Sequence, residues 1–407
     1  MIRSLRTGIT GLRGHQTKMD VTGNNIANVN TVAFKRSRAV FKEMLGQNLV
    51  GSSNTVGGVN TSFIGFGVSV GAIGQNWQQG AMESTGIATD LALNGDGFFV
   101  LDDAGRQLLT RDGSFLFDAN GNLTTSDGIN VQGYPIDSTT GQADTTQLGN
   151  ITADFSSRTP PTATTGLTAA GNLSGESVNG DTFNMTRVIY DEQGEAHTVD
   201  ITFTKTANAN EWDYALTYAG DLGTNPFTEP TGTITFGVDG TLAANTNISF
   251  DWDANFVSGG PTMTVSLDGL TQFAGSNTGA IIEQDGTTFG ELTGFNISDQ
   301  GFLNLNYSNG DSVPIFQLAI AKVSNLDGLS SLGENYYAAN ADSGEATIGR
   351  AGVDVSTQVI SGSLEASNVD LSQEFTDMIV SQRGYQAAAR IITVSDEILS
   401  ETVNLKR

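Results

Sequence analysis

The chain has 407 residues, of which 38% are hydrophobic, so it can build two to four domains with buried cores and is not wholly disordered. Its formal net charge of −25 excludes nucleic-acid binding through a general basic surface, because such binding needs a basic footprint. The absence of cysteine excludes disulfides, thiolate metal sites and thiol nucleophiles.

Residues 1–28 are predicted to form an amphipathic helix. One face carries apolar and long side chains at alternating steps of three and four: Ile2, Leu5, Ile9, Leu12, Gln16 and Met19. Gly8, Gly11 and Gly14 lie on a second face about 130° away, and each costs ~1 kcal/mol relative to alanine. Two explanations stay open. Either a second backbone approaches these glycines closely, or they loosen a chain end that becomes ordered on assembly.

The first 50 residues hold eight basic and two acidic side chains, a net charge of +6 in an otherwise acidic chain. Charges that flank an interface helix are the favoured interpretation, ahead of a membrane-binding or nucleic-acid-binding arm. The segment after Arg3 and Arg6 lacks the apolar core of a cleaved signal peptide, and no run approaches the ~18 apolar residues of a membrane span. We therefore expect neither a cleaved signal peptide nor membrane insertion.

Asparagines are predicted to end this helix within residues 24–31 (NNIANVNT), because asparagine is a poor interior residue and a good helix terminator. Residues 31–71 are predicted to be an extended connector. Within it, residues 46–62 are rich in glycine, serine and asparagine, which indicates a linker or loop. From residue 63 the hydrophobic period switches to two, so residues 63–70 are predicted to form a strand.

Short apolar runs separated by turn residues fill the centre of the chain, and this pattern is typical of sandwiches or barrels. Residues 114–117 and 122–124 flank a turn sequence and predict one hairpin. Residues 186–190 and 197–205 predict a second hairpin in the same way. A polar stretch at 137–165, with two adjacent prolines, indicates a domain boundary.

Residues 369–407 are predicted to form a second helix, with Asp370 as N-cap and Gln373 as its capping-box partner. A strict four–three alternation predicts a coiled-coil seam along Leu371, Phe375, Met378, Gln382, Tyr385, Ala389, Ile392, Asp396, Leu399 and Val403. Antiparallel pairing of the two end helices places Arg13 level with Asp396. An ion pair between these two side chains is our hypothesis for what sets the register.

The predicted fold is mainly β with terminal α-helices. A coiled-coil-like helical domain comes from both chain ends, and two β-rich domains follow, the outer one inserted into the inner one. The predicted ranges are 1–30 and 368–407 for the terminal helical inner-tube domain, 31–71 for the connector, 72–146 and 285–367 for the β-rich middle domain, and 147–284 for the inserted outer domain.

No catalytic, cofactor-binding or metal site is predicted. The two histidines, His15 and His197, are far apart in sequence and fall in different predicted domains, which argues against a catalytic triad or a zinc site. Asp118, Asn120 and Asn122 match the start of a calcium loop, but the later loop positions do not fit, so we interpret them as a hairpin turn.

Three segments carry a resemblance to a known family. They are residues 24–31 followed by Phe34 and Lys35, residues 90–100 (DLALNGDGFFV), and residues 364–387 (LEASNVDLSQEFTDMIVSQRGYQA). Together they resemble the rod and hook branch of the bacterial flagellar axial proteins. The length and the large insert are similar to the flagellar hook proteins within it. A distal-rod-type axial protein and a surface β protein with a coiled-coil stalk remain the alternatives.

The resemblance implies a structural subunit rather than an enzyme, in the hook of the bacterial flagellum outside the cytoplasm. Such subunits polymerise into a curved hollow helical tube, a universal joint that passes torque from motor and rod to the filament. The implied partners are further copies of the chain, a rod protein at the proximal end, a hook–filament junction protein at the distal end, the hook cap during assembly and the flagellar export apparatus. The chain departs from the family at Ala388, where asparagine is usual, and it lacks the cysteine of a covalent cross-link known in some relatives.

The expected subunit-interface residues lie on the two end helices. They are Ile2, Leu5, Gly8, Ile9, Gly11, Leu12, Gly14, Met19, Asn24, Asn25, Asn28, Leu371, Phe375, Met378, Gln382, Tyr385, Ile392, Asp396, Leu399 and Val403.

Overall fold

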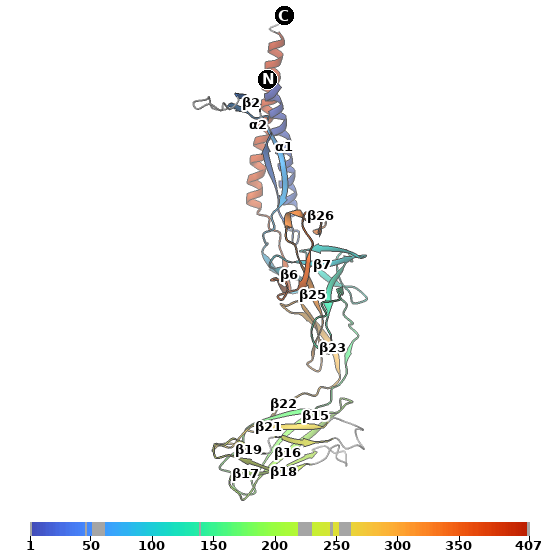
Figure 1. Cartoon of the computed structure of the whole chain (residues 1–407), viewed down its shortest axis with the longest axis vertical. Helices are drawn as coiled ribbons and strands as arrows, with labels where there is room; N and C mark the ends of the chain where they lie inside the picture. Colours follow the sequence, from blue (N-terminus) through green and yellow to red (C-terminus); the bar gives the residue numbers. More distant parts are fainter. Residues whose placement is uncertain are drawn as a thin grey trace. The chain divides into compact units, whose positions relative to one another are not determined.

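A computed structural model describes residues 2–44, 47–50, 62–137, 140–218, 230–244, 247–251 and 262–404. These residues are mostly β-strand with an α-helix at either end, which confirms the predicted fold class (Figure 1). The chain divides into two compact units. The terminal unit comprises Met1–Asp154, Phe295–Asn304 and Pro314–Arg407, and the inserted unit comprises Phe155–Gly294 and Leu305–Val313.

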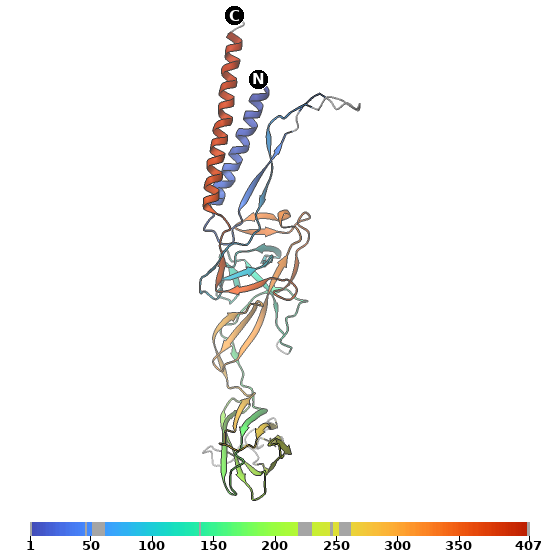
Figure 2. The same cartoon turned by 90° about the vertical axis from the view of Figure 1, so that its left-hand side faces the viewer.

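The terminal helices α1 (Ile2–Ala27) and α2 (Leu371–Asn404) lie side by side and antiparallel (Figure 2). Asp370 is the N-cap of α2, as predicted, because its carboxylate accepts the N–H groups of Ser372 at 2.8 Å and Gln373 at 3.2 Å. The predicted capping box is wrong. The side chain of Gln373 donates instead to Asp377, 3.1 Å away, one helical turn further on.

An antiparallel ribbon follows α1. Its strands are β1 (Ser37–Glu43) with β4 (Val68–Gln75) and β2 (Gln47–Val50) with β3 (Ser62–Ile64). The strand expected at 63–70 is interrupted between β3 and β4, where Gly67 has a φ of +109° that ordinary strand geometry does not allow. Of the linker expected at 46–62, residue 46 and residues 51–61 lie outside the described residues.

The rest of the terminal unit is a β domain in which strands from both halves of the chain pair. β25 lies beside β11 and β7, and β7 continues through β8 and β27 to β26. The bounds are β5 (Met82–Ser84), β6 (Leu91–Asn94), β7 (Phe98–Asp103), β8 (Arg106–Thr110), β9 (Phe115–Phe117), β10 (Leu123–Thr125), β11 (Asn130–Pro135), β12 (Gly149–Asn150), β25 (Ser312–Lys322), a 3-10 turn (Leu326–Gly328), β26 (Ser330–Gly333), β27 (Tyr336–Ala338), β28 (Thr347–Arg350), β29 (Gln358–Ser361) and β30 (Ser363–Glu365).

The segment before α2 also pairs with strands of this domain: β29 pairs with β6, and β30 pairs with β5. Five residues, 366–370, then separate the end of β30 from the start of α2. The predicted hairpin at 114–124 is confirmed, since β9 and β10 pair antiparallel.

The inserted unit is a β-sandwich. Its five-stranded sheet has the order β15–β16–β17–β18–β19 and its four-stranded sheet has the order β20–β21–β14–β22, and one core of side chains from both sheets fills the space between them. Trp212 and Phe203 are fully buried in that core. The bounds are β14 (Gly166–Asn172), β15 (Thr182–Tyr190), β16 (Ala196–Lys205), β17 (Glu211–Tyr218), β18 (Thr231–Phe236), β19 (Leu242–Ala244), β20 (Asn247–Phe250), β21 (Met263–Thr271) and β22 (Ala280–Gln284).

The chain enters and leaves the sandwich through a paired neck. β13 (Arg158–Thr159) pairs with β23 (Gly290–Ile297), and Thr162 and Thr287 exchange two backbone hydrogen bonds of 2.9 Å. β24 (Phe302–Tyr307) follows β23 in the chain. The second predicted hairpin is also confirmed, because β15 and β16 pair antiparallel along their whole length.

Candidate subunit interface on the terminal helices

Small residues make the contact between α1 and α2. A Cβ atom at Gly8 would lie only 3.3 Å from the carbonyl oxygen of Ala388, and a Cβ at Gly11 would lie 3.6 Å from the Ala388 Cβ. Of the two explanations left open for these glycines, close approach of a second backbone therefore holds for Gly8, whereas a Cβ at Gly11 would make only an ordinary contact with a side chain. Gly14 faces a different neighbour, since its Cβ would lie 2.9 Å from the ring of Phe41 on β1.

Contacts along the helices define their register. The hydroxyl oxygens of Ser4 and Ser395 are 3.3 Å apart, the ring of His15 lies against Gly384, and Lys18 pairs with Asp377 at 3.0 Å. The antiparallel arrangement is thus confirmed.

The hypothesis of an ion pair between Arg13 and Asp396 is wrong. Asp396 adjoins Ser395 and so lies level with Ser4, which is nine residues or about 13 Å along α1 from Arg13. Both Arg13 and Asp396 are exposed. Lys18 and Asp377 do form an ion pair between the two helices. Burial acts to raise the pKa of Asp377, but hydrogen bonds from Gln373 and Lys18 outweigh it and hold that pKa below its usual value.

A buried polar cluster joins the foot of both helices to β1. The Asn25 amide donates to Glu374 at 3.1 Å and to the carbonyl of Ser37 at 2.8 Å, and its oxygen accepts the N–H of Ser37 at 2.9 Å. Arg36 forms an ion pair with Glu374 at 2.7 Å. Asn25, which we expected in a subunit interface, is therefore buried within its own chain.

A second buried cluster attaches the connector to the β domain. The Lys35 ammonium lies 2.6 Å from one oxygen of Glu365, and the Arg111 guanidinium lies 3.5 Å from the other. Lys35 and Glu365 are each 1% exposed and Arg111 is 3% exposed. Burial lowers the pKa of Lys35 and of Arg111, and the charge of Glu365 opposes this shift. Two consecutive cations thus pair with carboxylates on either side of the start of α2: Lys35 with Glu365, and Arg36 with Glu374.

The face of α2 that packs on its own chain differs from the predicted seam. The buried residues recur every seven positions and are small or polar: Glu374, Ser381, Ala388 and Ser395. Half of the predicted seam lies half-buried beside this line: Met378, Tyr385, Ala389, Ile392 and Leu399. The other half is exposed: Leu371, Phe375, Gln382, Asp396 and Val403. The seam is rotated by one residue because small side chains fit where the two backbones approach closely, while Glu374 at the start of the line is held by Asn25 and Arg36.

Large apolar side chains on α2 consequently face outward. Eight of them are 40–69% exposed: Leu371, Phe375, Ile379, Val380, Ile391, Val394, Ile398 and Val403. These eight residues, which lie on both sides of the buried line, are together called the outer face of α2. On α1, Ile9 and Asn24 are exposed, Leu5, Leu12, Met19 and Asn28 are half-buried, and the side chain of Ile2 lies outside the described residues. Eight large apolar side chains exposed on one helix indicate an interaction site.

The segment that matches the start of a calcium loop forms a turn. Asp118 accepts the N–H groups of Asn120 at 2.8 Å and Asn122 at 2.7 Å, so the hairpin-turn interpretation is confirmed.

Within the described residues, one group of histidine and carboxylate side chains could hold a metal ion, and it lies in the inserted unit. No helix in the described part of the chain is long and apolar enough to cross a membrane.

Four family models match the chain in order: "Flagella basal body rod protein" at residues 5–35, "Flagellar hook protein FlgE/F/G D1 domain" at 92–167, "Flagellar basal body protein FlaE D2 domain" at 176–287 and "Flagellar basal body rod FlgEFG protein C-terminal" at 360–405. The last of these covers the whole of α2, and the first covers most of α1.

The chain is 34% identical to the flagellar hook protein FlgE of Treponema pallidum and 32% identical to that of Borreliella burgdorferi, in each case over the full length of both chains. It is 33% identical to FlgE of Salmonella typhimurium, over 99% of this chain and 100% of that one. The crystal structure of the Helicobacter pylori flagellar hook protein FlgE2 is similar in fold, with a TM-score of 0.53 at 13% identity, over 68% of this chain and 98% of that one.

Proposed function

Because this chain belongs to the flagellar hook protein family, it is a structural subunit of the flagellar hook, and we propose that the outer face of α2 is the surface through which it polymerises. The role as a joint between motor and filament follows from the family. The hook protein family is structural, and the distal-rod and stalked-surface alternatives do not account for full-length similarity to hook proteins.

The exposure of the outer face of α2 carries this proposal. Fully burying one such side chain contributes about 1.5–3 kcal/mol, so leaving eight of them half in water is costly for a free subunit. In a homopolymer, other copies of the chain can bury these apolar side chains. A contact between different faces of identical subunits generates an open helical assembly when its rotation does not close into a ring.

The expected interface residues divide into two groups on this proposal. Gly8, Gly11 and Asn25 act within the chain by setting the helix pair. The exposed residues, such as Phe375, Val403 and Ile9, contact neighbouring subunits. The outer face adds five positions that the sequence pattern did not single out: Ile379, Val380, Ile391, Val394 and Ile398.

A paired substitution tests the proposal. Changing Val380 and Val394, which are 56% and 50% exposed, to serine should abolish tube formation, as seen by electron microscopy of concentrated protein, while the helical circular dichroism of the monomer is retained. The matched control changes Val178 and Val238 to serine, since these are 67% and 105% exposed on the inserted unit. Tubes of normal yield from the α2 variant would refute the proposal.

The inserted unit has a separate proposed role in hook curvature. Residues 163–286 can be replaced by an Asn-Gly turn, because Thr162 and Thr287 already face each other across the neck. We expect this chain to assemble into straight tubes and to impair swimming. Unchanged curvature and swimming would show that the unit is not needed for bending.

The proposed partners are further copies of the chain, a rod protein, the hook–filament junction protein and the hook cap. We propose that the chain leaves the cytoplasm through the flagellar export apparatus, and that it binds neither nucleic acid nor membrane. The acidic charge of the chain supports the exclusion of nucleic acid.

A further inference from the structure

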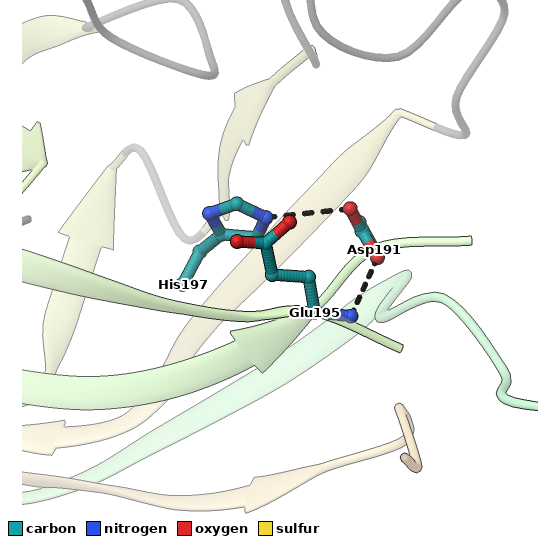
Figure 3. A group of neighbouring side chains, drawn as sticks. All are labelled: Asp191, Glu195 and His197. Atoms are coloured by element: carbon teal, nitrogen blue, oxygen red, sulfur yellow. Dashed lines mark hydrogen bonds and ion pairs between the residues drawn. The ribbon is translucent and has the colours of Figure 1, made fainter. Parts of the chain in front are cut away.

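The turn between β15 and β16 gathers three potential metal ligands. Asp191, Glu195 and His197 each offer one donor atom, and these atoms all lie within 4.8 Å of one another (Figure 3). Asp191 is 5% exposed and His197 is 3% exposed, whereas Glu195 is exposed to solvent. A metal ion held there would therefore be anchored on two buried donors and reached from the solvent side.

Backbone hydrogen bonds of the turn orient the Asp191 carboxylate. Its Oδ1 accepts the N–H groups of Gln193 at 2.9 Å and Glu195 at 2.8 Å. Gly194 provides the tight turn with a φ of +80°. The second oxygen, Oδ2, is thereby directed toward the Nε2 atom of His197 (Figure 3). These donors are ordered by the fold itself, so an ion does not have to order them on binding.

The spacing of the two buried donors fits an ion better than a direct bond. Asp191 Oδ2 and His197 Nε2 are 3.4 Å apart. A charge-assisted hydrogen bond between such groups is usually about 2.7–2.9 Å long. Two ligands that each lie about 2.0–2.1 Å from a tetrahedral zinc ion are about 3.3 Å apart.

We propose that this turn binds one divalent transition-metal ion of the zinc type, with Asp191, Glu195 and His197 as protein ligands and water completing the coordination. One imidazole and two carboxylates suit zinc, whereas calcium and magnesium prefer oxygen ligands throughout. Residues 155–294 hold seventeen acidic and three basic side chains, so the local potential attracts cations. Because the ion binds the folded turn, it stabilises the inserted unit by mass action.

Calorimetric titration of the full chain with Zn²⁺ tests the site. We expect one saturable site per chain, with an affinity that falls at least tenfold in Glu195→Gln. Glu192→Gln is the matched control, because Glu192 is exposed in the same turn but lies outside the ligand group, and it should bind like the unsubstituted chain. Glu195 is exposed, so its substitution leaves the fold intact, which thermal unfolding without metal verifies.

The histidine content of the chain allows the site to be located. His15 and His197 are the two histidines, and cysteine is absent, so imidazole NMR signals report directly on which histidine binds zinc. Only the His197 signals should shift at one equivalent of Zn²⁺. Absence of saturable binding below about 100 µM, equal binding by Glu195→Gln, or a shift of the His15 signals instead would each overturn the proposal. None of these outcomes bears on polymerisation through α2.

Discussion

Glu365 neutralises two buried cations, and replacing it by glutamine should strongly destabilise the terminal unit. Its carboxylate lies 2.6 Å from Lys35 and 3.5 Å from Arg111, and it also accepts the N–H of Gly80 at 2.8 Å. Removing one partner of a buried ion pair costs about 3–5 kcal/mol, because the remaining charge stays buried without compensation. We expect a loss of that size in the free energy of unfolding, which is at least a hundredfold in the unfolding equilibrium.

Urea unfolding followed by helical circular dichroism measures this loss, since both described helices belong to the terminal unit. Asp103→Asn is the matched control. The pair of Asp103 with Arg106 is 2.8 Å long, but both side chains are largely exposed, so its loss should change stability by at most about 1 kcal/mol.

A second variant tests the charge argument itself. The cluster holds two cations for one carboxylate, so Lys35→Met leaves Arg111 and Glu365 as a balanced pair. This variant should lose less stability than Glu365→Gln. An equal or larger loss in Lys35→Met would refute the reasoning that charge balance governs the cluster.

Three further predictions concern the helices and the β domain. Gly8→Val should weaken the α1–α2 pair by about 1–3 kcal/mol, because the larger side chain overpacks against Ala388. Gly23→Ala should raise helix stability by about 0.5–1 kcal/mol, because the space around Gly23 is open. Urea unfolding measures both changes. The pKa of Asp377 is lowered from 3.8, so the ionised carboxylate stabilises the fold fully above pH 3.8, and this contribution is lost as the pH falls below 3.8. When the pH is lowered from 5 to 3, the free energy of unfolding should therefore fall less in Asp377→Asn than in the unsubstituted chain. Burial, with a hydrogen bond to Asp127, raises the pKa of Tyr336 to about 12. The contribution of the protonated phenol to stability is therefore lost as the pH rises above about 10, the ordinary pKa of tyrosine. Between pH 9 and 11, the urea midpoint of unfolding should fall less in Tyr336→Phe than in the unsubstituted chain.

Local patterns were sufficient to predict the elements. The N-cap at Asp370, the hairpins β9–β10 and β15–β16, and the helices at both chain ends depend on residues within a few positions of each other, and all are present. The connector prediction missed the β1–β4 ribbon, because its strands pair across the 24 intervening residues 44–67, which a local pattern does not relate.

The functional surface was predicted less completely. A four–three alternation shows that α2 has an apolar stripe, but it does not show which neighbour covers each side of the helix. The glycines of α1 select the small side chains of α2 as the intrachain contact, which turns half of the predicted seam outward. Glu374 had no sequence signal, because its partners Asn25 and Arg36 are more than 330 residues away.

By itself, the amino-acid sequence determined that this chain is a β-rich protein with paired helical ends and that it belongs with the flagellar hook proteins, since these conclusions depend on local periodicity and contiguous motifs. Only the tertiary structure decided the register of the helices, the buried ion clusters at Lys35 and Arg36, and which apolar side chains stay exposed for assembly. The physical reason is that burial and charge pairing are properties of neighbours in space. In this chain, the decisive neighbours come from opposite ends of the sequence.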